Sequence, residues 1–369
     1  MKGSWFNPAQ AMFTAIYLLV GLGIVMAYST SAVYSDFFYH NPQHFLFRQI
    51  FYTVIGTLIL FITSTIPLNF WKRHARTMML ISISFLALVY IPGIGKTAGG
   101  AQRWIHLGLI NFQPAEYAKV AVCVYLADYL TRKKKAIQEG SLKIYLPPLC
   151  LIGIVCILTL AQPDLGSTAF IFILVAILIF LSGLKLWFVG IAALVIVPVF
   201  YILVIRVPYR LSRLSAYLNP WNDPQGSGFQ IIQSFLAFGL GGVRGVGLGQ
   251  SMQKLFYLPS SYNDFVFSII AEELGLVGLL VVILLYGIVF ISGIELSRHA
   301  HDSFERLLII ALTLMIVLQA LIHMLVTTGL IPTKGLPLPF VSFGGTSLLF
   351  NFMAFGLILS ASNQGARVR

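Results

Sequence analysis

Long apolar runs alternate with short polar connections along almost the whole chain. A helix needs about 20 apolar residues to cross the hydrocarbon core of a membrane. Ten such runs lie near residues 11–28, 47–65, 76–92, 113–131, 144–161, 165–183, 186–207, 265–294, 307–329 and 344–362. The pattern predicts an all-α polytopic membrane protein with about ten transmembrane helices, forming one transmembrane domain over residues 1–369. The first run is interpreted as a retained helix rather than a signal peptide, because only Lys2 supplies a basic region before it.

Composition supports a membrane protein and argues against a soluble domain, a disulfide framework and a metal site of cysteine or histidine. Hydrophobic residues make up 58% of the chain and charged residues only 10%. Soluble domains carry about 25% charged residues, so lipid must be the solvent for most of this chain. The three cysteines lie in apolar runs, and an odd buried set gives no support to a disulfide framework. The seven histidines are scattered, so neither residue type predicts a metal site.

Lysines and arginines in the connections predict the orientation, because cytoplasmic loops carry an excess of both. If every run crosses, one side receives Lys2, Lys72, Arg73, Arg76, Arg132, Lys133, Lys134, Lys135, Lys143, Lys185, Arg298, Arg306, Arg367 and Arg369. The short loops of the other side hold only Arg48, Lys96, Arg103 and Lys334. We therefore expect a multi-pass protein of the inner (cytoplasmic) membrane with both termini in the cytoplasm. The net charge of +12 suits anionic lipid at the inner face and requires no nucleic acid.

The connections expected on the outer side are rich in proline and glycine. A long extracytoplasmic loop, residues 208–263, joins spans 7 and 8 and carries six glycines between positions 239 and 249. Within it, residues 229–238 are apolar enough for a re-entrant or interfacial segment. Residues 99–104 and 332–347 have a similar character. Irregular backbone at membrane depth is tolerated where it is buried in protein or lines a wet cavity.

Ionisable residues within or beside a span are costly and usually face a polar interior. Glu116 and Lys119 lie three positions apart on one predicted helix, so they face the same way and can pair. Capping by Gln113 and Glu116 explains the glutamate but not the lysine. A structural ion pair and a contact with an anionic ligand both remain open, and the two are compatible.

Four further acidic positions stand out. The position of Asp164 predicts a turn residue or a helix N-cap. The position of Asp264 also predicts a helix cap, but Asn263 could cap the same helix equally well and leave Asp264 free. Glu272 and Glu273 follow Asp264 by eight and nine positions, which is ~12–14 Å along a helix axis. At least one of these glutamates must therefore face a polar interior.

The charged residues expected on the extracytoplasmic side combine acidic residues with several cations. They comprise Asp264, Asp164, Arg103, Arg210, Arg213 and Lys254, with Glu116 and Lys119 opening toward the same face. Several cations beside lipid suit a phosphate-bearing lipid headgroup, and a lone carboxylate suits a general base.

Short motifs in a fixed order connect these residues to a known family. They are residues 100–105 (GAQRWI), 113–119 (QPAEYAK), 162–166 (QPDLG), 209–213 (YRLSR), 219–221 (NPW), 228–230 (GFQ), 233–234 (QS), 263–265 (NDF) and 332–347 (PTKGLPLPFVSFGGTS). Over nearly its whole length the chain resembles the SEDS family (shape, elongation, division and sporulation). Residues 332–335 are closer to the FtsW type and its sporulation relatives, whereas residues 337–340 lean toward RodA; we favour the FtsW type.

The resemblance implies a peptidoglycan glycosyltransferase that polymerises lipid II with undecaprenyl pyrophosphate as leaving group. It implies Asp264 as general base and Glu116 as the residue that holds Lys119. The residues implied to bind substrate are Arg103, Glu116, Lys119, Asp164, Arg210, Arg213, Gln233, Lys334 and Ser342. The implied cofactor is a divalent cation, Mg²⁺ or Mn²⁺, and the implied partners are a class B penicillin-binding protein and other divisome or elongation proteins.

The sequence departs from the family pattern around the predicted base. Ser260 stands where many members have Glu, and Tyr262 and Asn263 stand where a His-Thr pair is common. Gln102 replaces a frequent Arg, and Phe343 a frequent Tyr. These changes touch the loop that presents the aspartate and leave the aspartate itself intact.

Two other functions compete with polymerisation. A lipid II flippase would also be polytopic, with intramembrane charges and broken helices. A scaffold that only recruits cell-wall enzymes would not need Asp264. Replacement of Asp264 by Asn discriminates them, because only the polymerase requires that carboxylate.

Overall fold

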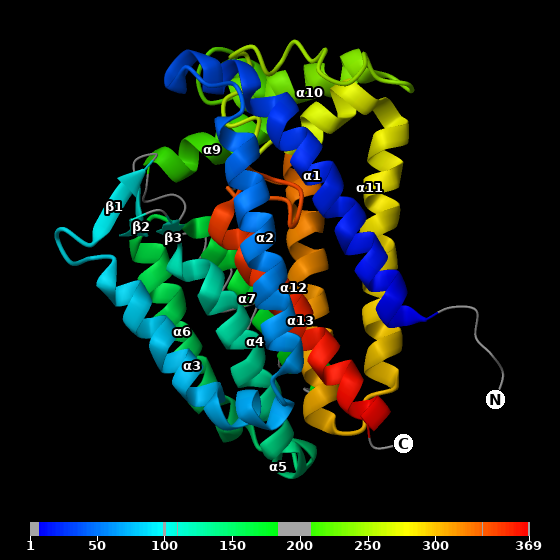
Figure 1. The fold of residues 1–369 in the computed structure, drawn as a ribbon. Coiled ribbons are helices and arrows are strands. Elements are labelled where there is room, and N and C mark those ends of the chain that lie inside the picture. The colour runs from blue at the N-terminus through cyan, green and yellow to red at the C-terminus, as the bar shows by residue number, and fades with distance from the viewer. Residues whose placement is uncertain (1–6, 99–100, 109, 184–207, 334, 368–369) are drawn as a thin grey trace.

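The computed structural model describes residues 7–98, 101–108, 110–183, 208–333 and 335–367 (Figure 1). The helices are α1 (Pro8–Tyr39), α2 (His44–Thr65), α3 (Leu68–Leu88), α4 (Pro114–Arg132), α5 (Lys134–Gln138), α6 (Leu146–Ala161), α7 (Leu165–Leu181), α9 (Pro208–Leu218), α10 (Phe229–Gly241), α11 (Val266–Arg298), α12 (Ser303–Thr327) and α13 (Gly345–Arg367). The 3-10 turns are η1 (Leu142–Tyr145) and η2 (Pro220–Asn222). The strands are β1 (Gly95–Ala98), β2 (Ala101–Leu107) and β3 (Ile110–Phe112).

The mostly helical, polytopic fold predicted from the apolar runs is confirmed. Within the described residues, helices occupy nine of the ten predicted segments, and the remaining segment, 186–207, lies outside the described residues. Six of the described helices, α1, α2, α6 with η1, α11, α12 and α13, have the length and apolar character to cross a membrane. The apolar segment 229–238 forms α10, a short helix beside the outer loops.

Local sequence signals explain where several helices begin. Asn7 accepts hydrogen bonds from the first backbone N–H groups of α1, and Pro8 occupies the first turn, where its missing N–H costs nothing. Asp302 caps α12 through the backbone N–H groups of Phe304 and Glu305. Asp164 caps α7 by accepting from Ser167 N, which confirms its predicted role as a cap.

Helix α4 lies at the centre of the bundle, and all of its residues from 118 to 130 are buried. It packs against α3, α7, α12 and α13, while α1 crosses α11 and α2 lies along α13 (Figure 1). Small residues permit the α2–α13 approach, because a Cβ on Gly56 would strike the Phe352 ring and one on Gly356 would strike Thr63.

A small antiparallel sheet, in the order β1-β2-β3, lies between α3 and α4 in the chain. The all-α prediction did not include it. The Gln102 side chain donates a hydrogen bond of 2.8 Å to the carbonyl of Val89, which fastens β2 to the end of α3. The sheet is the element that brings Arg103 to the end of the bundle where Asp264 lies.

Helix α11 is broken at Gly275, whose φ is 66° and ψ −163°. The glycine-rich segment after α10 fills this break through backbone hydrogen bonds. Val246 N and Gly247 N donate to the carbonyls of Glu272 and Glu273 at 2.9 and 3.0 Å, and Leu276 N donates to Gly242 O at 3.0 Å. The irregular backbone predicted here is therefore satisfied by other backbone groups, as membrane burial requires.

Candidate active site at the outer end of the bundle

Asp264 lies in the last turn of the outer loop, directly before α11. Its backbone N–H donates to Ser260 O at 3.0 Å, whereas α11 begins after Phe265 without any side-chain cap. The prediction that Asp264 or Asn263 caps this helix is therefore wrong, because neither side chain reaches the first N–H groups. No described residue donates a hydrogen bond to the Asp264 carboxylate, which is left available for chemistry.

The surroundings of Asp264 tune its acidity. Burial raises the pKa of this carboxyl to about 6, the nearby Arg213 and Arg103 oppose the rise, and Asp164 adds to it. Residues from β2, α9, the start of α7 and the loop before α11 therefore meet within electrostatic reach. A carboxyl with a pKa near 6 is mostly ionised at neutral pH and is still a competent proton acceptor.

Arg103 and Asp164 form one side of this site. An Arg103 guanidinium nitrogen lies 3.8 Å from an Asp164 carboxylate oxygen. Asp164 also accepts hydrogen bonds from the backbone N–H and hydroxyl of Ser167, at 3.0 and 2.8 Å. The capping aspartate thus fixes the guanidinium as well as the helix, so the sheet and α7 are held together at the site.

The segment after α12 is joined to α9 through Arg213 and to the loop of Asp264 through Ser342. Arg213 donates to the carbonyl of Thr333 at 3.1 Å. The buried Ser342 hydroxyl donates to Asn263 O at 2.7 Å and accepts from Leu338 N at 2.9 Å. Ser342 is therefore placed to position the backbone beside Asp264 rather than to touch a ligand.

Glu116 and Lys119 make a buried ion pair at 2.8 Å, which confirms the predicted pairing. The Lys119 ammonium also donates to the Gln319 amide oxygen at 2.6 Å, and the Gln319 amide nitrogen donates to Pro337 O at 2.8 Å. This chain of contacts ties α4 to α12 and to the segment after it. Lys119 is only 1% exposed and its ammonium is bound by protein groups, so the pair is structural.

Several predicted site residues are not brought to Asp264 by described contacts. Gln233 lies half-buried on α10, and its side chain makes no hydrogen bond with any described residue. Arg210 lies on α9, but its side chain is outside the described part of the chain, as is Lys334 entirely.

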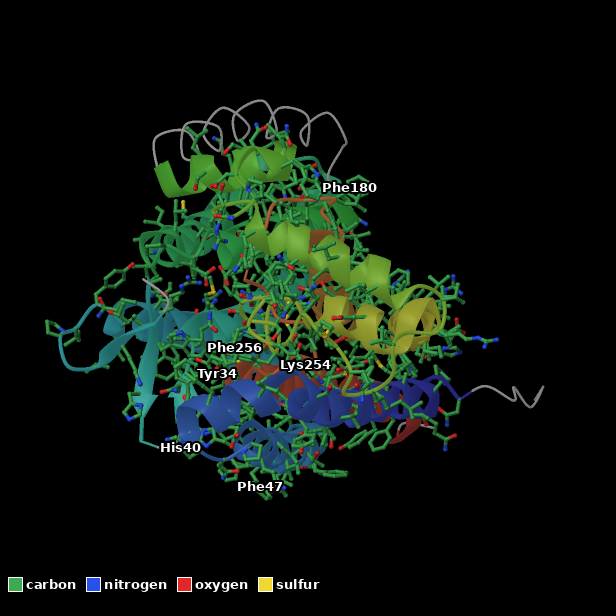
Figure 2. The ribbon with its side chains drawn as sticks, turned by 90° about the horizontal axis from the view of Figure 1, so that it is seen from above. Tyr34, His40, Phe47, Phe180, Lys254 and Phe256 are labelled. Atoms are coloured by element: carbon green, nitrogen blue, oxygen red, sulfur yellow. The ribbon has the colours of Figure 1, made fainter. Side chains whose placement is uncertain are left out.

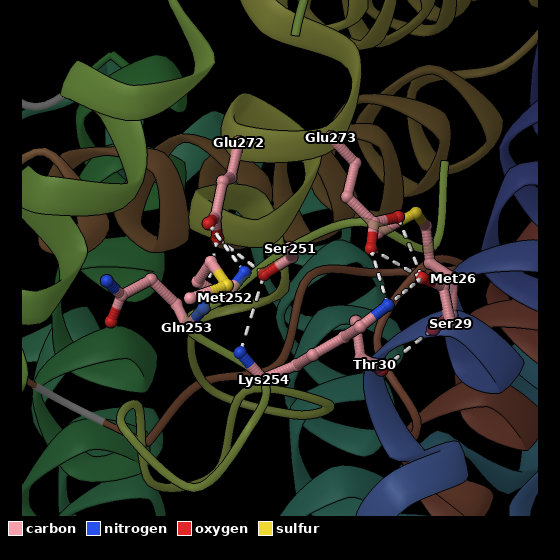
Figure 3. Close-up of polar contacts among 9 residues, drawn as sticks. All are labelled: Met26, Ser29, Thr30, Ser251, Met252, Gln253, Lys254, Glu272 and Glu273. Atoms are coloured by element: carbon pink, nitrogen blue, oxygen red, sulfur yellow. Dashed lines mark hydrogen bonds and ion pairs between the residues drawn. The ribbon is translucent and has the colours of Figure 1, made fainter. Parts of the chain in front are cut away.

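Lys254 was expected among the outer cations, but the structure places it elsewhere. It lies 3.0 Å from Glu273, and the Ser29 hydroxyl donates to the same carboxylate at 2.6 Å (Figure 3). Glu272 points the other way, accepting from the Ser251 hydroxyl and from Met252 N at 2.8 Å. Both glutamates thus face a polar interior, and they fasten α1 and the outer loop to α11.

Two of the departures from the family pattern, Tyr262 and Phe343, belong to an aromatic cluster near Asp264. Tyr262 lies 5.0 Å from the Phe45 ring and 5.5 Å from Tyr34, and Phe343 lies 4.8 Å from Phe45. Tyr34, on α1, also has its ring 6.2 Å from that of Phe256, and Figure 2 labels these two residues next to each other. Ring packing thus supports the loop where the family commonly uses other residues.

The described residues contain no group of three His, Cys, Asp or Glu side chains able to hold a metal ion. Asp164 already uses its oxygens on Ser167 and Arg103. Among the described residues that meet at this site, Asp264 is then the carboxylate left available, so a Mg²⁺ or Mn²⁺ ion here would depend on oxygens supplied by a phosphorylated substrate.

Comparisons with known proteins agree with this geometry. A family described as cell cycle protein, FtsW/RodA/SpoVE, matches residues 9–366. A probable peptidoglycan glycosyltransferase FtsW of Legionella pneumophila is 41% identical over 95% of this chain and 89% of its own length. Stage V sporulation protein E of Bacillus subtilis is 38% identical, over 96% of this chain and 97% of its own length.

Two solved structures share the fold. A chain of a peptidoglycan synthase complex that coordinates polymerization and crosslinking has a TM-score of 0.79 and 28% identity, covering 96% of this chain and 98% of that one. Rod shape determining protein RodA of Thermus thermophilus has a TM-score of 0.70 and 25% identity, covering 96% of each. With its motifs, its fold and its relatives in agreement, the chain belongs to the SEDS (FtsW/RodA/SpoVE) family, and to the FtsW type within it.

Proposed function

We propose that this chain is a peptidoglycan glycosyltransferase that polymerises lipid II at the outer face of the cytoplasmic membrane during septal and cell-wall synthesis. The observation that carries the proposal is Asp264. It is a partly buried carboxylate, free of hydrogen-bond donors among the described residues and flanked by Arg103 and Arg213. The family membership supplies the reaction class. Both termini would then lie in the cytoplasm, as the distribution of lysine and arginine indicates.

In the proposed reaction, the GlcNAc hydroxyl of the acceptor attacks the MurNAc anomeric carbon of the donor. A new glycosidic C–O bond forms while the bond to the undecaprenyl pyrophosphate breaks, and the pyrophosphate leaves with the bonding electrons. Asp264 accepts the hydroxyl proton as the bond forms. Ionised at neutral pH, it is suited to this role.

The arginines would act on the leaving group. Negative charge grows on the pyrophosphate as the bond breaks, and fixed cations stabilise that charge without reorganising. Arg103 is held by Asp164, and Arg213 by the carbonyl of Thr333, so both guanidinium groups are positioned in advance. Asp264 would be the residue to hold a divalent cation, which would supply further positive charge to the leaving group, and no step of the mechanism depends on it.

The structural match to a peptidoglycan synthase complex supports a partner that crosslinks the new glycan. A class B penicillin-binding protein has that activity and is the partner that we propose, within a larger set of divisome or elongation proteins.

Polymerisation of labelled lipid II by the purified protein tests the proposal. Asp264→Asn should lower the rate by at least about 10²-fold, the usual contribution of a general base. Asp223→Asn is the matched control, because Asp223 is an exposed carboxylate of the same outer loop. Each variant is assayed with and without the penicillin-binding protein, with penicillin to block crosslinking and moenomycin to suppress unrelated polymerases. Undiminished glycan from Asp264→Asn would refute the base, and lipid II translocation in liposomes without polymer would support a flippase.

A further inference from the structure

A polar cavity lies at the opposite end of the bundle from Asp264. It has a volume of ≈ 490 Å³ and is lined by Asn69, Lys72, Arg73, Arg76, Asp128 and Arg132. These residues lie near the start of α3 and the end of α4, where α5 follows, whereas α9 and α10 lie at the other end (Figure 1). We call this cavity the basic pocket.

The spacing of its residues explains how the pocket forms. Residues 69, 72, 73 and 76 follow the i, i+3, i+4, i+7 pattern, so they share one face of α3. Asp128 and Arg132 are four positions apart on α4, which packs against α3. Two helices therefore direct polar side chains into one concavity.

Two of the cations are held in place by carboxylates. Arg132 makes hydrogen bonds of 2.9 and 3.0 Å to both oxygens of Asp128, which is buried. Lys72 lies 3.4 Å from Asp302 and 5.3 Å from the centre of the Phe304 ring, both at the start of α12. The walls of the pocket are thus ordered by contacts with α4 and α12.

The charge of the pocket is not balanced. Arg73 and Arg76 make no ion pair with any described residue, so two positive charges remain after Asp128 and Asp302 are counted. A general excess of cations at a cytoplasmic face explains their presence at this end of the bundle. It does not explain why four of them line one concavity together with the buried Asp128.

We propose that the basic pocket binds the phosphate headgroup of an anionic phospholipid from the inner leaflet. Basic pockets between transmembrane helices on the cytoplasmic side recognise such headgroups. The two unbalanced guanidinium groups match two phosphate charges, so a headgroup with two phosphodiesters, of the cardiolipin type, fits best. The volume lies within the ≈ 300–1,000 Å³ typical of small-ligand sites.

Lipid retention by the full-length protein, measured by native mass spectrometry during titration, tests this site. The probes are cardiolipin, phosphatidylglycerol, neutral phosphatidylcholine and inorganic phosphate. Arg73→Gln/Arg76→Gln should weaken cardiolipin binding roughly 30-fold, the loss expected when two cations facing an anionic headgroup are removed. Lys133→Gln/Lys135→Gln is the matched control, with the same change of charge outside the pocket, and it should bind as the wild type does. Arg73→Lys/Arg76→Lys should keep most of the affinity.

Equal losses in the pocket variant and the control would overturn the proposal in favour of diffuse surface attraction. Retention of phosphatidylcholine as strong as that of cardiolipin would also overturn it. Displacement of cardiolipin by submillimolar inorganic phosphate would reassign the pocket to a soluble phosphate. An unchanged elution profile shows that the pocket variant is folded, and since polymerisation is not the readout, the result is independent of the function proposed above.

Discussion

Acidification should stop polymerisation by protonating Asp264, at a pH far above that expected for an ordinary aspartate. A general base must be ionised to accept a proton, so activity should rise with pH as this carboxyl loses its own proton. Because burial raises its pKa to about 6, the acid limb of the kcat/KM profile should have its midpoint near pH 6.

The size of the effect follows from that value. With a pKa of about 6, roughly nine-tenths of the enzyme has an ionised Asp264 at pH 7 and roughly one-tenth at pH 5. An unperturbed aspartate would still be roughly nine-tenths ionised at pH 5. The two cases therefore differ by about ninefold in rate at pH 5, well beyond the error of a polymerisation assay.

Neighbouring charges give two variants with opposite expected shifts. Arg103 lowers the pKa of Asp264, so Arg103→Gln should move the acid limb to higher pH. Asp164 raises that pKa, so Asp164→Asn should move the limb to lower pH. Both substitutions can also lower the maximum rate, but the position of the limb is separate from its height.

The assay measures kcat/KM for labelled lipid II between pH 4.5 and 8, with return to pH 7.5 to show that the loss is reversible. A wild-type midpoint below about pH 4.5, close to the ordinary aspartate value, would refute the raised pKa. Shifts of the same sign in the two variants would refute the assigned electrostatics.

Two predictions concern the break in α11. Glu273→Gln or Lys254→Met alone leaves a buried unpaired charge and should destabilise the protein by about 3–5 kcal/mol. The double variant should recover part of that loss. Thermal unfolding measures both effects, and strictly additive shifts of the unfolding midpoint would contradict the coupling. Gly275→Ala should lower the unfolding midpoint, because φ is 66° and a Cβ would strike the backbone of Gly245. Gly287→Ala, on the same helix with open space around it, is the control and should change little.

The helices could be predicted because burial in lipid leaves a long and simple signal, an apolar run of near-constant length. The sheet carries no such signal. Its strands have 4, 7 and 3 residues, and their pairing depends on backbone hydrogen bonds between segments that look like loops. Its position is fixed by contacts such as that of Gln102 with Val89, which no periodicity in the sequence encodes.

The candidate site was predictable in its chemistry but not in its pairings. The sequence places Asp264, Asp164 and Arg103 at the outer end, and the structure brings them within electrostatic reach. The sequence could not show that Lys254 pairs with Glu273 rather than lying beside Asp264. That contact depends on how a loop of some twenty residues folds over the break in α11. The same limit made the expected cap at Asp264 wrong, since capping is decided by backbone geometry in one turn.

The position of Asp264 is determined by several independent anchors rather than by the helix that follows it. The loop before Asp264 is attached to α11 at two residues: the Ser251 hydroxyl donates to Glu272, and Lys254 forms an ion pair with Glu273. Beside it, Ser342 and Phe343 bind the carbonyls of the two preceding residues, at 2.7 and 3.0 Å. A loop with no regular structure of its own can thus present a base reproducibly, because its ends and its middle are fixed to rigid helices. Loss of one anchor should therefore lower kcat while the protein remains folded, whereas loss of Asp264 itself removes the base from an intact site.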